Sequence, residues 1–234
     1  MSNTPNRQSN IELLRIISML MILVVHTDFW ALGGPKLSDF YANPANAITR
    51  TVIQSITIVA VNVFIMISGW FGIKPRLRGL CNFLFQCAFF YIGIYLALLT
   101  IGLEPLSMKN ISACLCITPV NWFIMCYFAL YLLSPLMNAF LEKASKRQLE
   151  IFLVIFYIFQ TIWGWPFGGA DFVKSGYSPF SFIGLYILAR YLHLYGNKLL
   201  QGGGMDIHYN YSTEFRYLFY VAALQCYSKC VRLL

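Results

Sequence analysis

Residues 11–30 read IELLRIISMLMILVVHTDFW, and this stretch decides the fold class. Its length and apolar content are those of a helix that crosses the hydrocarbon core of a bilayer, which takes about 20 residues. Two ionisable residues, Arg15 and His26, interrupt the apolar run eleven positions apart. At about 100° and 1.5 Å per residue, their side chains share one helix face and lie roughly 16 Å apart. Ionisable groups inside a span are costly and are candidates for function.

The rest of the chain extends this pattern into a polytopic membrane protein. Of its 234 residues, 59% are hydrophobic and 11% are charged, and the mean hydropathy is +0.64. This composition excludes a soluble enzyme with a single anchor. We therefore expect an all-α bundle of about six full spans plus a partial one, the full spans lying near residues 11–31, 48–73, 79–102, 119–140, 149–166 and 180–199.

The basic residues predict the orientation of the chain. Its net charge is +8, but Lys and Arg fall in short loops between apolar runs, so we expect anionic membrane lipid and not nucleic acid as a partner. With the N-terminus inside, the inner segments carry Arg7, Lys74, Arg76, Arg78, Lys143, Lys146, Arg147 and Lys198, and the outer loops carry Lys36, Arg50, Lys109 and Lys174. This excess predicts a cytoplasmic N-terminus. Arg15 then lies near the inner surface and His26 toward the outer side.

Three segments follow from this organisation. Residues 1–10 are expected to form a cytoplasmic N-terminal segment, and residues 11–200 a transmembrane domain. Residues 201–234 form an atypical tail that opens with three glycines and contains too few apolar residues for a full span. The tail is compatible with a partial span, an interfacial helix, or an end altered by truncation or frameshift. The seven cysteines form no CxxC pair and no Cys/His spacing, so no metal site is expected.

Three motifs resemble one known family. Arg15 and His26 stand in the first helix with ten residues between them, and Phe64 to Phe71 read FIMISGWF, which is similar to an FxxxSGxF signature at the end of a second helix. Residues 122–136, from WF to LLSPL, are similar to a fourth-helix pattern. Together they resemble the membrane acyltransferase-3 family, bacterial O-acyltransferases of surface polysaccharides and related glycans, over residues 10–200.

The resemblance implies a function for the chain. It implies an enzyme of the bacterial inner (plasma) membrane that moves an acyl group, most often acetyl from acetyl-CoA, to a hydroxyl of a surface glycan or its lipid-linked precursor. Acyl-CoA is then a substrate, and no tightly bound cofactor is expected. Members usually have more spans than this chain shows, so the domain looks C-terminally truncated. Its basic loop, Lys74-x-Arg76-x-Arg78, also departs from a clean R-x-x-R.

The candidate site residues divide between a donor and an acceptor side. His26 is expected to act as general base on the acceptor hydroxyl, or to carry the acyl group briefly. The donor side is expected to comprise Arg15, Ser68, Gly69, Lys74, Arg76 and Arg78, whose cations suit phosphates. The acceptor side is expected to include Asn121 and Trp122. Glu12, three positions before Arg15, is a possible ion-pair partner, whereas Asp28 points about 200° from His26 and is not expected to orient it.

The same residues also allow other interpretations. Arg15 and the loop cations also suit anchors at the membrane interface. Ser68 and Gly69 suit close helix packing, and His26, Asn121 and Trp122 suit hydrogen bonds between helices or interface anchoring. At the level of the whole protein, the alternatives are a transporter or flippase for acyl groups or glycans, with His26 as a proton relay, and an inactive fragment.

Overall fold

The computed structural model describes residues 9–115, 118, 121–164, 173 and 176–200. The described part of the chain contains helices and no strand, which confirms the predicted all-α class. The elements are α1 Ser9–His26, the π-helix η1 Thr27–Ala31, α2 Leu37–Ala42, α3 Pro44–Thr57, α4 Ala60–Phe71, α5 Leu77–Thr100, α6 Met108–Cys114, α7 Trp122–Lys143, α8 Lys146–Gly164 and α9 Pro179–Leu200.

Helices occupy all six segments that the hydropathy predicts as spans. Four helical stretches are long and apolar enough to cross a membrane: Ser9–Phe29, Pro44–Phe71, Leu77–Thr100 and Trp122–Lys143. Helices α8 and α9 correspond to the other two expected spans, at 149–166 and 180–199. The count of six, and the shortening relative to the family, stay predictions. The expected segment 1–10 falls mostly outside the described residues, and the tail 201–234 falls wholly outside them.

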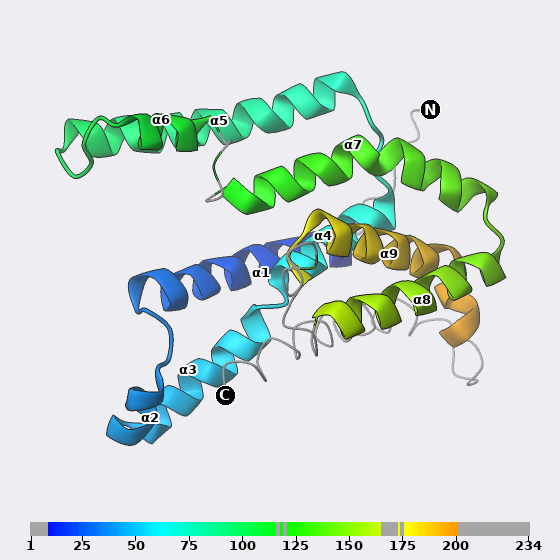
Figure 1. The fold of residues 1–234 in the computed structure, drawn as a ribbon, viewed down its shortest axis with the longest axis horizontal. Coiled ribbons are helices and arrows are strands. Elements are labelled where there is room, and N and C mark those ends of the chain that lie inside the picture. The colour runs from blue at the N-terminus through cyan, green and yellow to red at the C-terminus, as the bar shows by residue number, and fades with distance from the viewer. Residues whose placement is uncertain (1–8, 116–117, 119–120, 165–172, 174–175, 201–234) are drawn as a thin grey trace.

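The core is built around α4 and α9, which lie against each other at the centre of the molecule (Figure 1). Helix α4 is buried along almost its whole length, including Val63, Ile65 and Met66. Gly69 permits the close approach to α9, since a Cβ at this position would lie 2.6 Å from the backbone oxygen of Tyr186. Helices α1, α7 and α8 then pack around this pair.

Helix α1 lies at the edge of the bundle and contacts α4 with one narrow face. That face consists of Ile11, Leu14 and Ser18, spaced as the helical repeat requires. The two helices run in opposite directions in Figure 1. The start of α1 therefore lies near the end of α4, and both belong to the end of the molecule that is expected to face the cytoplasm.

Helix α5 is arranged differently, because it has no buried residue. Its main contacts within the described residues are with α6 and, more weakly, with α7, and it extends away from the core (Figure 1). Its exposed side chains are largely aromatic and aliphatic, including Phe85, Phe89 and Phe90. In a membrane, this surface would face lipid.

The second expected span, 48–73, is not one continuous helix. It is divided into α3 and α4 at Ile58 and Val59. The hydroxyl of Tyr177, just before α9, donates to the Ile58 carbonyl at 2.8 Å and so gives it a partner where the helix is interrupted. At the other end, Gly72 takes a φ of 74°, which stops α4 and turns the chain toward α5.

Candidate functional site

His26 is the last residue of α1, and its side chain is exposed. Its Nδ1 lies 2.9 Å from the carbonyl oxygen of Ile22. A carbonyl only accepts hydrogen bonds, so Nδ1 carries the proton in this contact, and in the neutral ring Nε2 keeps its lone pair. The backbone of α1 thus selects the tautomer in which the outward nitrogen is a base.

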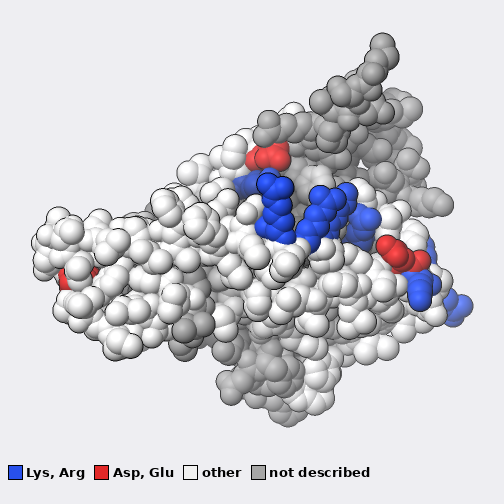
Figure 2. Space-filling model, turned by 90° about the horizontal axis from the view of Figure 1, so that it is seen from above, with Lys and Arg blue, Asp and Glu red and all other residues white. Residues whose placement is uncertain are grey.

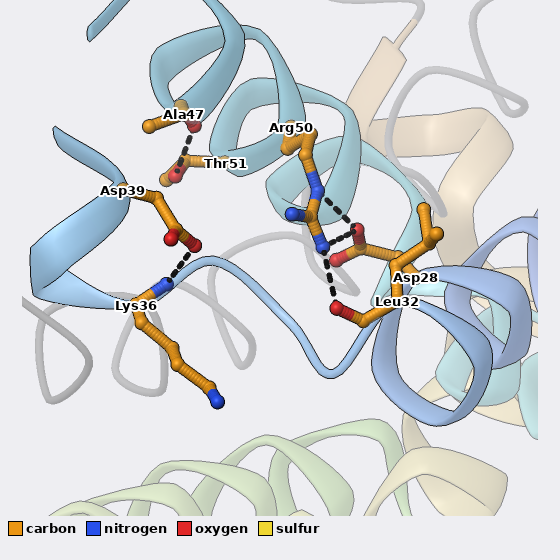
Figure 3. Close-up of polar contacts among 7 residues, drawn as sticks. All are labelled: Asp28, Leu32, Lys36, Asp39, Ala47, Arg50 and Thr51. Carbon is orange, nitrogen blue, oxygen red and sulfur yellow. Dashed lines mark hydrogen bonds and ion pairs between the residues drawn. The ribbon is translucent and has the colours of Figure 1, made fainter. Parts of the chain in front are cut away.

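The chain directly after His26 is a π-helical turn, Thr27–Ala31, held by an ion pair (Figure 3). Asp28 Oδ1 accepts from Arg50 of α3, with Nη2 at 2.8 Å and Nε at 2.9 Å. The side chains of Arg50 and Asp28 are only 20% and 11% exposed. Arg50 also reaches the Leu32 carbonyl at 3.5 Å. Short π-helical turns are frequent at functional sites, and this one fixes the backbone that follows His26.

Arg15 lies near the opposite end of the same helix and is half-exposed. Its Nη1 contacts Glu12 Oε1 at 3.2 Å, which confirms the predicted pairing. By helical geometry, Arg15 and His26 both stand about 60–90° from the centre of the face that packs on α4. They therefore follow one flank of the α1–α4 contact and are not enclosed by it.

Ser68 and Gly69 lie in the last turn of α4. Ser68 Oγ donates to the Phe64 carbonyl at 3.2 Å and is 3.4 Å from the Tyr127 hydroxyl, while Gly69 is covered by α9. Helix packing is thus their observed role. Their part in binding a donor stays a prediction.

The basic turn, which we define as residues 72–78, is held by side chains from two other helices. Tyr186 of α9 accepts from the Ile73 N–H at 2.9 Å and donates to Asn138 Oδ1 at 2.7 Å. Asn138 of α7 in turn donates to the Ile73 carbonyl at 2.9 Å. The hydroxyl of Tyr131, also in α7, binds the backbone of Arg76. It accepts from the Arg76 N–H at 2.9 Å and donates to the Arg76 carbonyl at 2.8 Å.

The cations of the basic turn point outward without partners. The side chains of Lys74, Arg76 and Arg78 are exposed and make no hydrogen bond or ion pair with any described residue. Figure 2 shows Lys and Arg side chains gathered on one part of the surface, whereas the end formed by α5 and α6 shows none in this view. A rigid backbone that carries unpaired cations is suited to an anionic ligand.

The structure adds a group that the motif analysis missed. Arg190, in the second half of α9, donates from Nη1 to the Trp70 carbonyl at 3.1 Å. The ring of His193 meets the Trp70 indole edge-on, with centroids 4.6 Å apart. The buried indole Nε1 of Trp70 has no partner among the described residues. An arginine within an apolar run, LYILARYLHLY, was the available signal.

The two residues expected on the acceptor side, Asn121 and Trp122, lie at the start of α7 but differ in exposure. Asn121 is 2% exposed, and its Oδ1 accepts from Thr118 at 2.7 Å. Trp122 is partly exposed and meets the ring of Tyr177 edge-on at 5.3 Å. Trp122 is therefore open to a ligand at this end, whereas Asn121 lies beneath the surface. Their contact with an acceptor stays a prediction.

The site is thus divided into two ends, joined by α1. One end has a histidine directly before an ion-paired turn. The other has exposed cations, without a partner among the described residues, on a turn that is held by hydrogen bonds. No group of His, Cys, Asp and Glu among the described residues is arranged to hold a metal ion.

Comparison with known proteins gives one match. A family model described as an acyltransferase domain matches residues 8–224, which is nearly the whole chain. No curated protein and no solved structure matches the chain.

Proposed function

The chain belongs to the membrane acyltransferase-3 family, and from that premise we propose that it acylates a hydroxyl of a cell-surface polysaccharide or of its lipid-linked precursor. The family and the four apolar helices make it a multi-pass membrane acyltransferase. We propose acetyl-CoA as the donor and the bacterial inner membrane, with a cytoplasmic N-terminus, as the location. The 2.9 Å contact between His26 Nδ1 and the Ile22 carbonyl is the observation that carries the mechanism, because it leaves Nε2 to act as the base.

The donor is proposed to bind at the basic turn. Coenzyme A carries phosphates, and Lys74, Arg76 and Arg78 offer three cations that pair with no residue the structure describes. Side chains of α7 and α9 hold the backbone that carries them. Guanidinium groups bind phosphate oxygens in pairs, which favours Arg for this role. Arg15 belongs to the same end through the α1–α4 contact and supplies a further cation, partly neutralised by Glu12.

The acyl group is proposed to react near His26. Helical geometry separates His26 from Arg15 by roughly 16 Å, a span suited to the long arm of a coenzyme A thioester. His26 Nε2 takes the proton of the acceptor hydroxyl while that oxygen attacks the thioester carbonyl. The C–O bond forms, the C–S bond breaks, and the imidazolium returns its proton to the coenzyme A thiolate. Acyl transfer through His26 itself would divide the same exchange into two steps.

The test is acyl transfer by membranes that contain the full chain. With labelled acetyl-CoA, the wild type should place label covalently on glycan, and His26→Ala should lower the rate by about 10²–10⁴, the usual contribution of a general base. Thr27→Ala is the matched control, because Thr27 is also exposed and bonds the carbonyl four residues back.

Equal protein levels in the membrane should accompany the loss of activity. Full activity of His26→Ala would contradict the mechanism. Passage of acyl groups or glycan across the membrane without covalent label would contradict acyl transfer and favour a transporter.

A further inference from the structure

A half-open cavity of about 280 Å³ lies beside the π-helical turn, on the same end of the molecule as His26. It is lined by Leu32 and Gly34, by Lys36, Asp39 and Ala42 of the α2 region, and by the start of α3 from Asn43 to Arg50. Its volume is near the lower limit for small-molecule sites, about 300 Å³. The cavity therefore suits one unit of a larger molecule that continues outward.

The cavity is tied to His26 through the ion pair described above. Arg50 lines the cavity, binds Asp28 in the turn that follows His26, and reaches the Leu32 carbonyl on the cavity wall (Figure 3). A ligand here would lie beside the backbone that carries the base.

The lining offers hydrogen-bonding groups that the fold does not use. The Lys36 ammonium and the Asn46 side chain make no hydrogen bond with any described residue, and Lys36 extends freely in Figure 3. The Asn43 side chain has one partner within the described ranges, the Asn46 N–H, which donates to its oxygen at 3.2 Å. Asp39 accepts from the Lys36 N–H at 2.9 Å and keeps further acceptor capacity. The lining thus offers both donors and acceptors to a ligand.

The charges at the cavity cancel. Arg50 is neutralised by Asp28. The formal charge of Lys36 is matched by that of Asp39, whose carboxylate binds the Lys36 backbone N–H and not its ammonium. Leu32 and Ala42 add apolar surface to the lining. Balanced charge, several amide and carboxylate groups and a small apolar patch match a neutral sugar ring, which has hydroxyls at its rim and C–H groups on its face.

We propose that this cavity is the acceptor subsite and that it binds one neutral pyranose unit of the glycan. Lys36, Asn43 and Asn46 donate to its hydroxyl oxygens, and Asp39 accepts from a hydroxyl. This inference rests on the proposed function, since it names the substrate that His26 deprotonates. It adds residues from the loop after the first span to an acceptor side that the sequence placed at Asn121 and Trp122.

The experiment measures sugar binding directly, by saturation-transfer NMR on the full chain in lipid nanodiscs. The probes are methyl glycosides of glucose, galactose and N-acetylglucosamine, with methyl glucuronide as the anionic comparison. At least one neutral glycoside should receive saturation from the wild type, and the glucuronide should receive less. Asn46→Ala and Lys36→Ala should each weaken binding about fivefold, as loss of one hydrogen bond does.

Two further variants separate binding from folding. Ala42→Phe fills the cavity without removing a polar group and should abolish the signal. Lys109→Ala removes another exposed lysine outside the cavity and should leave the signal unchanged. Absence of saturation transfer to every neutral glycoside, or equal transfer in Ala42→Phe, would overturn the proposal.

Acyl transfer in the same preparation distinguishes the two hypotheses. If transfer to glycan is retained and the acceptor KM is the same in wild type, Asn46→Ala and Ala42→Phe, the subsite is wrong while the function stands. If neutral sugar binds as expected but no acyl group is transferred, the proposed function fails independently.

Discussion

The two ends of the molecule use arginine and lysine in opposite ways. At the His26 end, Arg50 is mostly buried and bonds Asp28 and the Leu32 carbonyl through Nε and Nη2. At the other end, Lys74, Arg76 and Arg78 are exposed and have no partner in the described part of the chain, and tyrosine and asparagine side chains hold the backbone instead. A paired cation positions a backbone, whereas unpaired cations on a rigid backbone remain available to a ligand. Charge should therefore govern stability at one end and affinity at the other.

The largest loss of stability should come from breaking the ion pair between Asp28 and Arg50. Asp28→Ala leaves Arg50 largely buried without its counter-ion, and we expect the free energy of unfolding to fall by about 2–4 kcal/mol, somewhat below the value for fully buried pairs. Chemical unfolding in detergent measures this. Glu12→Ala is the control, because the pair between Glu12 and Arg15 is exposed and should contribute about 0–1 kcal/mol.

The double variant Asp28→Leu with Arg50→Leu should recover most of the loss, since no unpaired charge remains buried. A similar loss of unfolding free energy in Asp28→Ala and Glu12→Ala would show that the ion pair at the His26 end does not stabilise the fold more than an exposed pair does.

The second largest loss of stability should come from disturbing the contact between α4 and α9, which supports the basic turn. In Gly69→Ala, the new Cβ would lie 2.6 Å from a backbone oxygen of α9, so the helices must separate. We expect a loss of about 1–3 kcal/mol in unfolding free energy. Gly93→Ala on α5 is the matched control, because nothing lies within 4 Å of its Cβ, and it should be neutral or stabilising. Equal behaviour of the two variants would show that α4 and α9 are not in close contact.

The smallest effect on stability should come from the unpaired cations. Replacing Lys74, Arg76 and Arg78 together with Gln should change the unfolding free energy by less than about 0.5 kcal/mol. The KM for acetyl-CoA should nevertheless rise about tenfold or more, and the rise should shrink at high salt. Steady-state kinetics over a range of ionic strength measures both.

The control for this variant removes the same charge from the corner between α7 and α8, at Lys143, Lys146 and Arg147. Lys143 ends α7, and Lys146 and Arg147 begin α8, so their loss should affect the donor KM far less. An unchanged KM in the first variant would assign the basic turn to membrane orientation alone.

Most helix positions could be predicted from the sequence, because a membrane span is recognised by the length and apolar content of its own residues. Apolar length predicted α1, α5, α7, α8 and α9 to within a few residues. The pairing of Glu12 with Arg15 was also predictable, since the two are one helical turn apart.

What the sequence did not predict depends on distant partners. The break at Ile58 is completed by Tyr177, and Asp28 meets an arginine 22 residues away. Arg190 and His193 both contact Trp70, which is more than 100 residues earlier in the chain, and this contact could not be predicted from the local sequence. For Gly69, the sequence allowed both packing and ligand binding, and only the position of α9 identifies the packing role.

The contact between Ile73 and Tyr186 has a consequence for biosynthesis. The two residues are 113 positions apart, and at about 5–20 residues per second the ribosome takes roughly 6 to 23 seconds to reach the second after the first. During that interval, the nascent chain already displays Lys74, Arg76 and Arg78, but Ile73 lacks its partner from α9, Tyr186. If the basic turn binds the donor as proposed, that capacity is completed late in synthesis, when α9 docks on α4.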